Sequence, residues 1–320
     1  MFKILGKEIK RGTSTVIDLE VAKLHTRTPL KIPVIVERAK KDGPVLLLIA
    51  GIHGDEVNGV GIIREIIRKK YNKPSRGIVI CIPVFNIFGY LIQTREFPDG
   101  RDLNRVFPGT ESGSLASQFA YAFSKEIAPL VDYVIDFHTG GADRENAPQV
   151  RCVLSETKAF ELAKIFGAPF IIQSNYIAKS VREMVNKLGK TSLLFEGGKS
   201  KELDDKIISC GVNGTYNVMK YLGMHEGKLT VPLDSIIVSK SKWIRAPFSG
   251  MFKLKVANGS RVHKKDVLGV IQDPFGSFEK NVKAPFDCFV FCVNTSPVIN
   301  KGDALFHVSV ESESKVSADK

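Results

Sequence analysis

Short, continuous apolar runs constrain this 320-residue chain most strongly, because they end abruptly at glycine or at polar residues. The clearest are "VLLLIAG" (45–51), "GIVICIPVF" (77–85) and "DYVIDFHTGG" (132–141). Uninterrupted apolar runs of this length are typical of strands buried on both faces. Similar runs lie at 34–39, 150–155, 170–175 and 192–198, so the pattern predicts a largely parallel central sheet.

Segments with apolar residues at helical spacing separate these runs. They lie at 60–70, 115–130, 156–167, 180–189 and 204–223, and the last three end at a glycine, which favours a helix end. Ser114 is placed to cap the helix that begins after it. Alternating strands and helices predict an α/β sandwich over about residues 1–226.

The pattern changes after residue 226, where short alternating strands appear without a long helix. A weak internal repeat aligns residues 246–271 with residues 284–308, which predicts a quasi-symmetric β-sandwich over 227–312. This segment resembles the biotinyl/lipoyl-like sandwich, but the stretch between the two copies has no carrier-lysine motif. We therefore expect it to shape the structure or the substrate site. The charged end, 313–320, is expected to be disordered.

Composition excludes several classes of function. The net charge is +12, but the 46 basic residues are spread along the chain and form no dense tract, so we expect no nucleic-acid binding. No apolar run is long enough to span a membrane, and the start of the chain has no signal-peptide pattern. The five scattered cysteines, without a CxxC pair, are expected to be buried thiols in a cytoplasmic protein.

Polar residues that bear chemistry follow three of the predicted buried strands. His53 and Glu56 come after the first, His138 ends another, and Glu196 ends a third. In open α/β sheets, sites form beyond the carboxyl ends of the strands. Two histidines and one glutamate with an open fourth position are the usual ligands of a hydrolytic zinc ion. The sequence therefore predicts a zinc hydrolase site, with Asp55 as a turn residue or a support for His53.

Four motifs in this order resemble the succinylglutamate desuccinylase/aspartoacylase family: "GIHGDEVNG" (51–59), "DLNRVFPG" (102–109), "DFHTGG" (136–141) and "FEGG" (195–198). The resemblance implies a zinc-dependent deacylase. It also implies a zinc-carboxypeptidase-like α/β/α sandwich with a mixed, largely parallel central sheet. A C-terminal all-β, barrel-sandwich-like domain would follow it.

The resemblance implies a role for each matching residue. His53, Glu56 and His138 would bind one zinc ion per chain. Glu196 would be the general base and acid, which activates the zinc-bound water and then protonates the leaving amine. Glu196 ends an apolar run and has no basic neighbour in the sequence, a setting that suits a proton shuttle.

The second motif supplies the expected substrate contacts. Asn104 and Arg105 would grip the carboxylate of the amino-acid part of the substrate, because a planar guanidinium binds a carboxylate through two hydrogen bonds. Asp102 would orient Arg105.

An oxyanion stabiliser is also needed. Arg95 matches the family pattern for it better than Arg101. Arg151 is a candidate for binding a second anionic group.

The favoured function is zinc-dependent deacylation of an N-acylated amino acid or a related small amine. A metallocarboxypeptidase that acts on peptides and a catalytically inactive zinc- or ligand-binding homologue are the alternatives. The expected partner is a small molecule, with neither nucleic acid nor membrane, and the chain could form a homo-oligomer. The sequence leaves the acyl group and the amine open.

Overall fold

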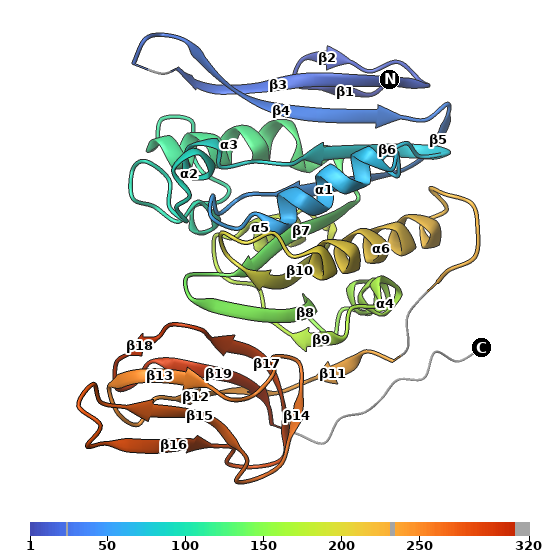
Figure 1. Cartoon of the computed structure of the whole chain (residues 1–320). Helices are drawn as coiled ribbons and strands as arrows, with labels where there is room; N and C mark the ends of the chain where they lie inside the picture. The colour runs from blue at the N-terminus through green and yellow to red at the C-terminus, as the bar shows by residue number, and fades with distance from the viewer. Residues whose placement is uncertain (24, 231–233, 311–320) are drawn as a thin grey trace.

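The computed structural model describes residues 1–310 except 24 and 231–233 (Figure 1). The predicted disordered end, 313–320, lies outside the described residues. A large mixed sheet runs through the whole molecule, with its strands stacked from β3 at one end to the C-terminal strands at the other. None of the described helices is both long enough and apolar enough to cross a membrane.

Four parallel strands in the order β6-β5-β7-β10 form the centre of this sheet. Antiparallel strands extend it, with β4 and β3 beyond β6 and β8 beyond β10. A short strand, β9, pairs with β8 in parallel. The bounds are β3 Thr13–Lys23, β4 Pro29–Arg38, β5 Lys41–Ala50, β6 Arg76–Ile82, β7 Tyr133–Gly140, β8 Arg144–Cys152, β9 Phe170–Gln173 and β10 Thr191–Lys199.

Helices cover both faces of this sheet, as the sequence predicts for an α/β sandwich. One apolar core lies under α1 (Asn58–Arg68), α4 (Thr157–Phe166) and α6 (Asp205–Tyr221). The core on the other face includes buried residues of α3 (Leu115–Glu126) and α5 (Val181–Lys187), with the short helix α2 (Ile87–Ile92) beside it. Ser114 caps α3 by accepting a hydrogen bond from the Ser117 amide. Single-turn 3₁₀ helices lie at η1 (Leu103–Arg105) and η2 (Ala128–Leu130).

The C-terminal strands form a sandwich of two sheets, and each sheet includes one short strand from the repeated segment that supplies most of the other sheet. One sheet has the order β16-β15-β13-β18, and the other contains β12, β19, β17 and β14. The repeated segments therefore occupy equivalent places, which confirms the predicted quasi-symmetry. The bounds are β12 Ser241–Arg245, β13 Gly250–Leu254, β14 Arg261–Val262, β15 Val267–Gln272, β16 Glu279–Lys283, β17 Cys288–Asn294, β18 Val298–Ile299 and β19 Ala304–Ser309.

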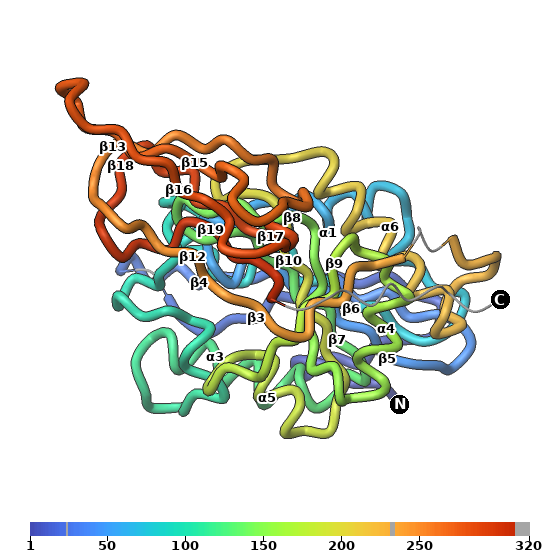
Figure 2. Tube along the Cα trace, turned by 90° about the horizontal axis from the view of Figure 1, so that it is seen from below, coloured from blue at the N-terminus to red at the C-terminus, as the bar shows by residue number. Residues whose placement is uncertain are grey.

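The C-terminal sandwich is joined to the central sheet by hydrogen bonds. Strand β17 pairs antiparallel with β8, and β11 (Ile236–Val238) pairs with β9. Figure 2 shows the C-terminal strands gathered beside β8 on one side of the molecule. A separate two-stranded sheet at the N-terminus contains β1 (Lys3–Ile4) and β2 (Lys7–Glu8).

Candidate metal centre and active site

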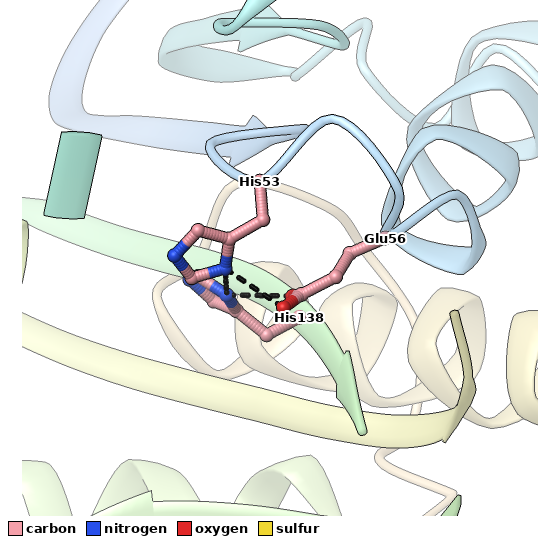
Figure 3. Close-up of side chains that lie close together, drawn as sticks. All are labelled: His53, Glu56 and His138. Carbon is pink, nitrogen blue, oxygen red and sulfur yellow. Dashed lines mark hydrogen bonds and ion pairs between the residues drawn. The ribbon is translucent and has the colours of Figure 1, made fainter. Parts of the chain in front are cut away.

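His53, Glu56 and His138 meet at the carboxyl edge of the parallel strands (Figure 3). Strand β5 ends at Ala50, and Gly51 turns the chain with a φ of +62°, a conformation that favours glycine. His53 and Glu56 follow in the turn before α1, while His138 lies near the end of β7. Because β5 and β7 are parallel neighbours, their ends bring the three side chains together.

The three ligand atoms lie close together and are buried. His53 Nδ1 lies 2.7 Å from Glu56 Oε1, and His138 Nδ1 lies 2.8 Å from Glu56 Oε2. The two Nδ1 atoms are 3.2 Å apart. Two nitrogens bound to one tetrahedral zinc ion would stand roughly 3.3 Å apart. The histidine nitrogens therefore fit a zinc ion, with the carboxylate still at hydrogen-bond distance from both.

A carboxylate stands behind each imidazole. Asp102 Oδ1 lies 3.1 Å from His53 Nε2, and Asp136 Oδ2 lies 3.0 Å from His138 Nε2, although the second pair lacks hydrogen-bond geometry. Metal-binding histidines commonly have such a partner, which fixes the ring orientation and leaves the other nitrogen free for the metal. The arrangement of donors thus supports a metal site.

Charges inside the cluster shift the pKa of each triad residue, Glu56, His138 and His53. Burial opposes the charged form of Glu56, but the two imidazoles beside it hold the pKa of its carboxyl well below the usual value. Burial likewise opposes protonation of His138, yet Asp136 and Glu56 raise its pKa well above the usual value. His53 is raised in pKa in the same way, against burial, by Glu56 and Asp102.

The structure brings Arg95 to this triad and leaves Arg101 outside it. Arg95 Nη1 lies 3.1 Å from both His53 Nδ1 and Glu56 Oε1. Arg101 is exposed and bonds to Asp99 instead. Of the two sequence candidates for oxyanion stabilisation, only Arg95 therefore lies beside the triad. Its catalytic role stays a prediction.

Asp102 has different partners from those predicted. The sequence interpretation paired it with Arg105, and it offered Asp55 as a turn residue or a support for His53. Asp102 instead contacts His53 and accepts hydrogen bonds from Arg95 Nε and Nη2 at 3.2 and 2.8 Å. Asp55 is buried, and its Oδ1 has no hydrogen-bond partner among the described residues. The sequence could not show this, because the 95–105 loop folds back over the triad.

Asn104 and Arg105 lie on η1 and line a cavity that the triad also lines. Asn104 is buried, and its Oδ1 accepts a hydrogen bond of 2.9 Å from the Val181 amide at the start of α5. The exposed Arg105 donates from Nη1 to the Asn104 carbonyl at 2.7 Å. Arg105 has no carboxylate partner among the described residues, which leaves its guanidinium open to a ligand.

Glu196 stands directly beside His138, its partner in the register of β10 and β7. Asn146 Nδ2 donates to Glu196 Oε2, and Arg151 Nη1 lies 3.3 Å from Glu196 Oε1. Glu196 therefore has a basic neighbour in space, although it has none in the sequence. Arg151 comes from the adjacent antiparallel strand β8, a neighbour that only the sheet register reveals.

These residues line one cavity of about 410 Å³. Sequence reasoning missed several side chains in its wall, because they reach it from β8, α5 and the C-terminal strands. Among them are Asn146, Arg182, Trp243 and Cys292. Trp243 and Cys292 belong to the C-terminal sandwich, so this part of the chain borders the cavity.

Comparisons with known proteins agree with this geometry. Residues 42–222 match the model of the succinylglutamate desuccinylase/aspartoacylase catalytic domain. The N-alpha-acetyl-L-2,4-diaminobutyric acid deacetylase of Halomonas elongata is 30% identical over 254 residues, which cover 76% of this chain and 74% of that protein.

Two solved structures share the fold. A succinylglutamate desuccinylase/aspartoacylase from Rhodobacter sphaeroides aligns with a TM-score of 0.81 at 24% identity, over 93% of this chain and 96% of that chain. The product-bound ectoine utilization protein EutE (DoeB) from Ruegeria pomeroyi aligns with a TM-score of 0.82 at 23% identity, over 94% and 96%. At these identities the likeness shows the fold.

Proposed function

The chain belongs to the succinylglutamate desuccinylase/aspartoacylase family, and on that premise we propose that it hydrolyses the amide bond of an N-acylated amino acid or a related small amine. The buried triad of His53, Glu56 and His138 is the observation that carries the proposal. The printed activity of the Halomonas relative, a deacetylase, supports the same reaction type.

One zinc ion is the proposed cofactor, held by the triad. Two facing Nδ1 atoms and one carboxylate are the donor set that zinc hydrolases use, with one position left for water or substrate. Zinc held there would supply Lewis acidity, which polarises the amide carbonyl and makes water nucleophilic at neutral pH. Asp102 and Asp136 keep the two imidazoles oriented with Nδ1 toward the ion.

Glu196 is the proposed proton carrier. The Asn146 amide donates to its Oε2 and the Arg151 guanidinium lies 3.3 Å from its Oε1, so both hold the carboxylate in place. Glu196 would take a proton from the attacking water and then give it to the nitrogen of the leaving amine. Its place next to His138 in the sheet supports this role.

The remaining polar groups would bind and stabilise the substrate. Arg105, with Asn104 beside it, would hold the carboxylate of the amino-acid part. Arg95 would donate hydrogen bonds to the oxygen that becomes negative as the carbonyl is attacked. The cavity of about 410 Å³ suits a small substrate.

A hydrolysis screen of N-acyl amino acids and short peptides tests the proposal, with zinc content measured on the same samples. We expect the protein to release acid from N-acyl amino acids faster than it cleaves peptides. Glu196→Gln should lower kcat by roughly 100- to 10,000-fold without loss of zinc. Glu202→Gln, the same change at an exposed residue of the loop before α6, is the matched control. A Glu196→Gln protein that holds zinc and works at the wild-type rate would refute the mechanism.

A further inference from the structure

A second cavity, of about 440 Å³, lies at the opposite edge of the central sheet from the triad. Residues from the start of β3, the end of β4, the start of β5 and the loop before β6 line it. These are the amino ends of the parallel strands β5 and β6, whereas the triad lies beyond the carboxyl ends. The two cavities share no lining residue, so this one is separate from the active site.

Glu37 places a buried carboxylate in the wall of this cavity without a cationic partner. The residue is 7% exposed, and no basic side-chain nitrogen of the described residues lies within 4.0 Å of its carboxylate. Oε1 accepts hydrogen bonds from the Ser14 hydroxyl at 2.8 Å and from Asn72 Nδ2 at 3.4 Å, and no such bond reaches Oε2 from the described residues. Asn72 Oδ1 is a second buried acceptor without a donor. Because a buried carboxylate is normally paired, Glu37 Oε2 is open to a cationic donor.

The rim of the cavity is basic. Lys40, Lys41 and Lys73 are exposed, and no carboxylate of the described residues lies within 4.0 Å of their ammonium groups. Arg38, in the same wall, lies 3.8 Å from Asp42, which does not line the cavity. The lining thus contains four basic residues and one acid. The rim therefore attracts an anionic group, while the buried acid requires a cationic one.

These charges discriminate between classes of ligand. A simple anion would leave the Glu37 carboxylate unpaired and be repelled by it, and a simple cation would be repelled by the lysines. A small zwitterion satisfies both, with its ammonium group at Glu37 Oε2 and its carboxylate at the lysines of the rim. We infer that this cavity is a binding site for a free α-amino acid, and its volume suits a ligand of that size.

The inference goes beyond the proposed function, because it concerns a second site. Deacylation of an N-acylated amino acid would release a molecule of the same class. Strand β5 begins at Lys41 in the wall of this cavity and ends at Ala50, just before the His53 turn. A bound amino acid would therefore lie at the far end of the strand that leads to the triad. Binding here does not require hydrolysis, so the two proposals can fail separately.

A binding screen on the zinc-loaded protein tests the inference. Thermal unfolding is measured with each standard L-amino acid except cysteine and histidine, which bind zinc themselves, and calorimetry then gives the Kd. We expect at least one amino acid to bind with a Kd of roughly 10 mM or below. Glu37→Gln should weaken this binding roughly 10- to 100-fold, and Lys73→Met should weaken it less. Glu20→Gln, the same change at an exposed residue of β3, should leave the Kd unchanged.

Hydrogen exchange distinguishes this cavity from the active site. The amino acid should slow exchange over residues 37–41 and 72–75 in the wild type but not in Glu37→Gln, whether or not any N-acyl amino acid is hydrolysed. If Glu37→Gln does not fold, Lys40→Met and Lys73→Met, which change exposed residues, provide the same comparison.

Three results would overturn the inference. Slower exchange confined to residues 102–105 and 180–182 would mean that amino acids bind only at the active site. Protection by inorganic phosphate that becomes stronger in Glu37→Gln would show a site for anions alone. The absence of protection over 37–41 and 72–75 with every amino acid tested would show that the cavity binds none of them.

Discussion

Each imidazole of the triad has a carboxylate beside it that is not one of the proposed metal ligands. Asp102 is the more telling of the two, because it contacts both His53 and Arg95. These two contacts, and the charge of His53, hold the Asp102 pKa below its usual range, although burial opposes this. An ionised Asp102 therefore holds the His53 ring and the Arg95 guanidinium in place beside the triad. In the proposed mechanism this would orient His53 for zinc and Arg95 for the carbonyl.

Replacing Asp102 with asparagine should therefore weaken zinc binding. We expect a loss of roughly 10- to 100-fold in affinity, measured by competition with a chelator, and a lower kcat. Asp55→Asn is the matched control, because Asp55 is buried in the same turn but is not the carboxylate that contacts His53 Nε2. Equal losses in the two variants would contradict the role given to Asp102.

Zinc affinity should also depend on pH in a defined direction. In the metal-free protein the pKa of His138 is raised, so the imidazole is protonated at neutral pH and must lose that proton to bind zinc. The pKa of His53 is raised too, so affinity should rise with pH by up to about tenfold per pH unit for each imidazole that must lose a proton, until the pH passes the raised pKa values. Glu56 stays ionised and adds no dependence near neutrality. Calorimetry in buffers of different ionisation enthalpy should detect proton release, and zinc binding without it would contradict this assignment.

The position of a single site residue could be predicted from the sequence where that residue lies in a local motif at the end of a predicted strand. His53, Glu56 and His138 follow apolar runs directly, so the strand pattern is enough to bring them together. The partners of Glu196 could not be found in this way, because Asn146 and Arg151 reach it across a strand pair. The same holds for Arg182, which reaches the cavity wall from α5.

At the scale of elements, the turn after β5 is fixed by its packing against α2. A Cβ atom added at Gly54 would lie 1.9 Å from the Gly89 carbonyl carbon and 2.2 Å from the Tyr90 nitrogen. Gly54 does not have a positive φ, so glycine is required there for close approach. Glycine is therefore favoured at Gly51 by its positive φ and at Gly54 by the close approach of α2.

Gly54→Ala should accordingly displace the His53 turn. We expect a loss of about 3 kcal/mol or more in the free energy of unfolding, together with loss of zinc. The added carbon would clash with the backbone of α2, and neither α2 nor the His53 turn can move without strain. Gly189→Ala is the control: its φ is +71°, but no atom lies within 4 Å of the added carbon. The control should cost only about 1 kcal/mol and keep zinc. Thermal unfolding and metal analysis measure both effects, and normal zinc content in Gly54→Ala would contradict this account.

The elements themselves were predictable to different degrees. Continuous apolar runs predict the buried parallel strands, and apolar residues at helical spacing predict the helices between them. The structure confirms these predictions. Strand β3 was not predicted, because it lies at a sheet edge and its side chains are exposed or half-buried apart from the buried Leu19. Strand β8 begins at Arg144, earlier than the apolar run at 150 suggests, since its first half lines the polar cavity.

At the scale of the whole molecule, the C-terminal sandwich completes the site. Cys292 of β17 pairs in register with Asn146 of β8, the residue that donates to Glu196. An apolar cluster of Ala147, Phe170 and Phe291, among others, fastens the two parts together. The sequence placed a boundary near residue 226, but it could not show that one sheet crosses it, because strand pairing between distant segments leaves no local signal.

The two parts should therefore unfold in one transition. Trp243 is the only tryptophan and reports on the C-terminal sandwich, whereas the helices of the described residues all lie within 58–221. Fluorescence and far-ultraviolet circular dichroism should give the same midpoint in a thermal or urea titration. Two separated midpoints would show that the sandwich is an independent domain attached only weakly.

The most direct test of zinc-dependent deacylation is metal reconstitution followed through activity. Protein stripped by a chelator should hydrolyse no N-acyl amino acid, and one equivalent of zinc per chain should restore the rate. His138→Ala should bind zinc far more weakly and stay inactive at that stoichiometry, because it removes one of the three ligands. Hydrolysis by stripped protein at the rate of the zinc-loaded enzyme would contradict the central claim.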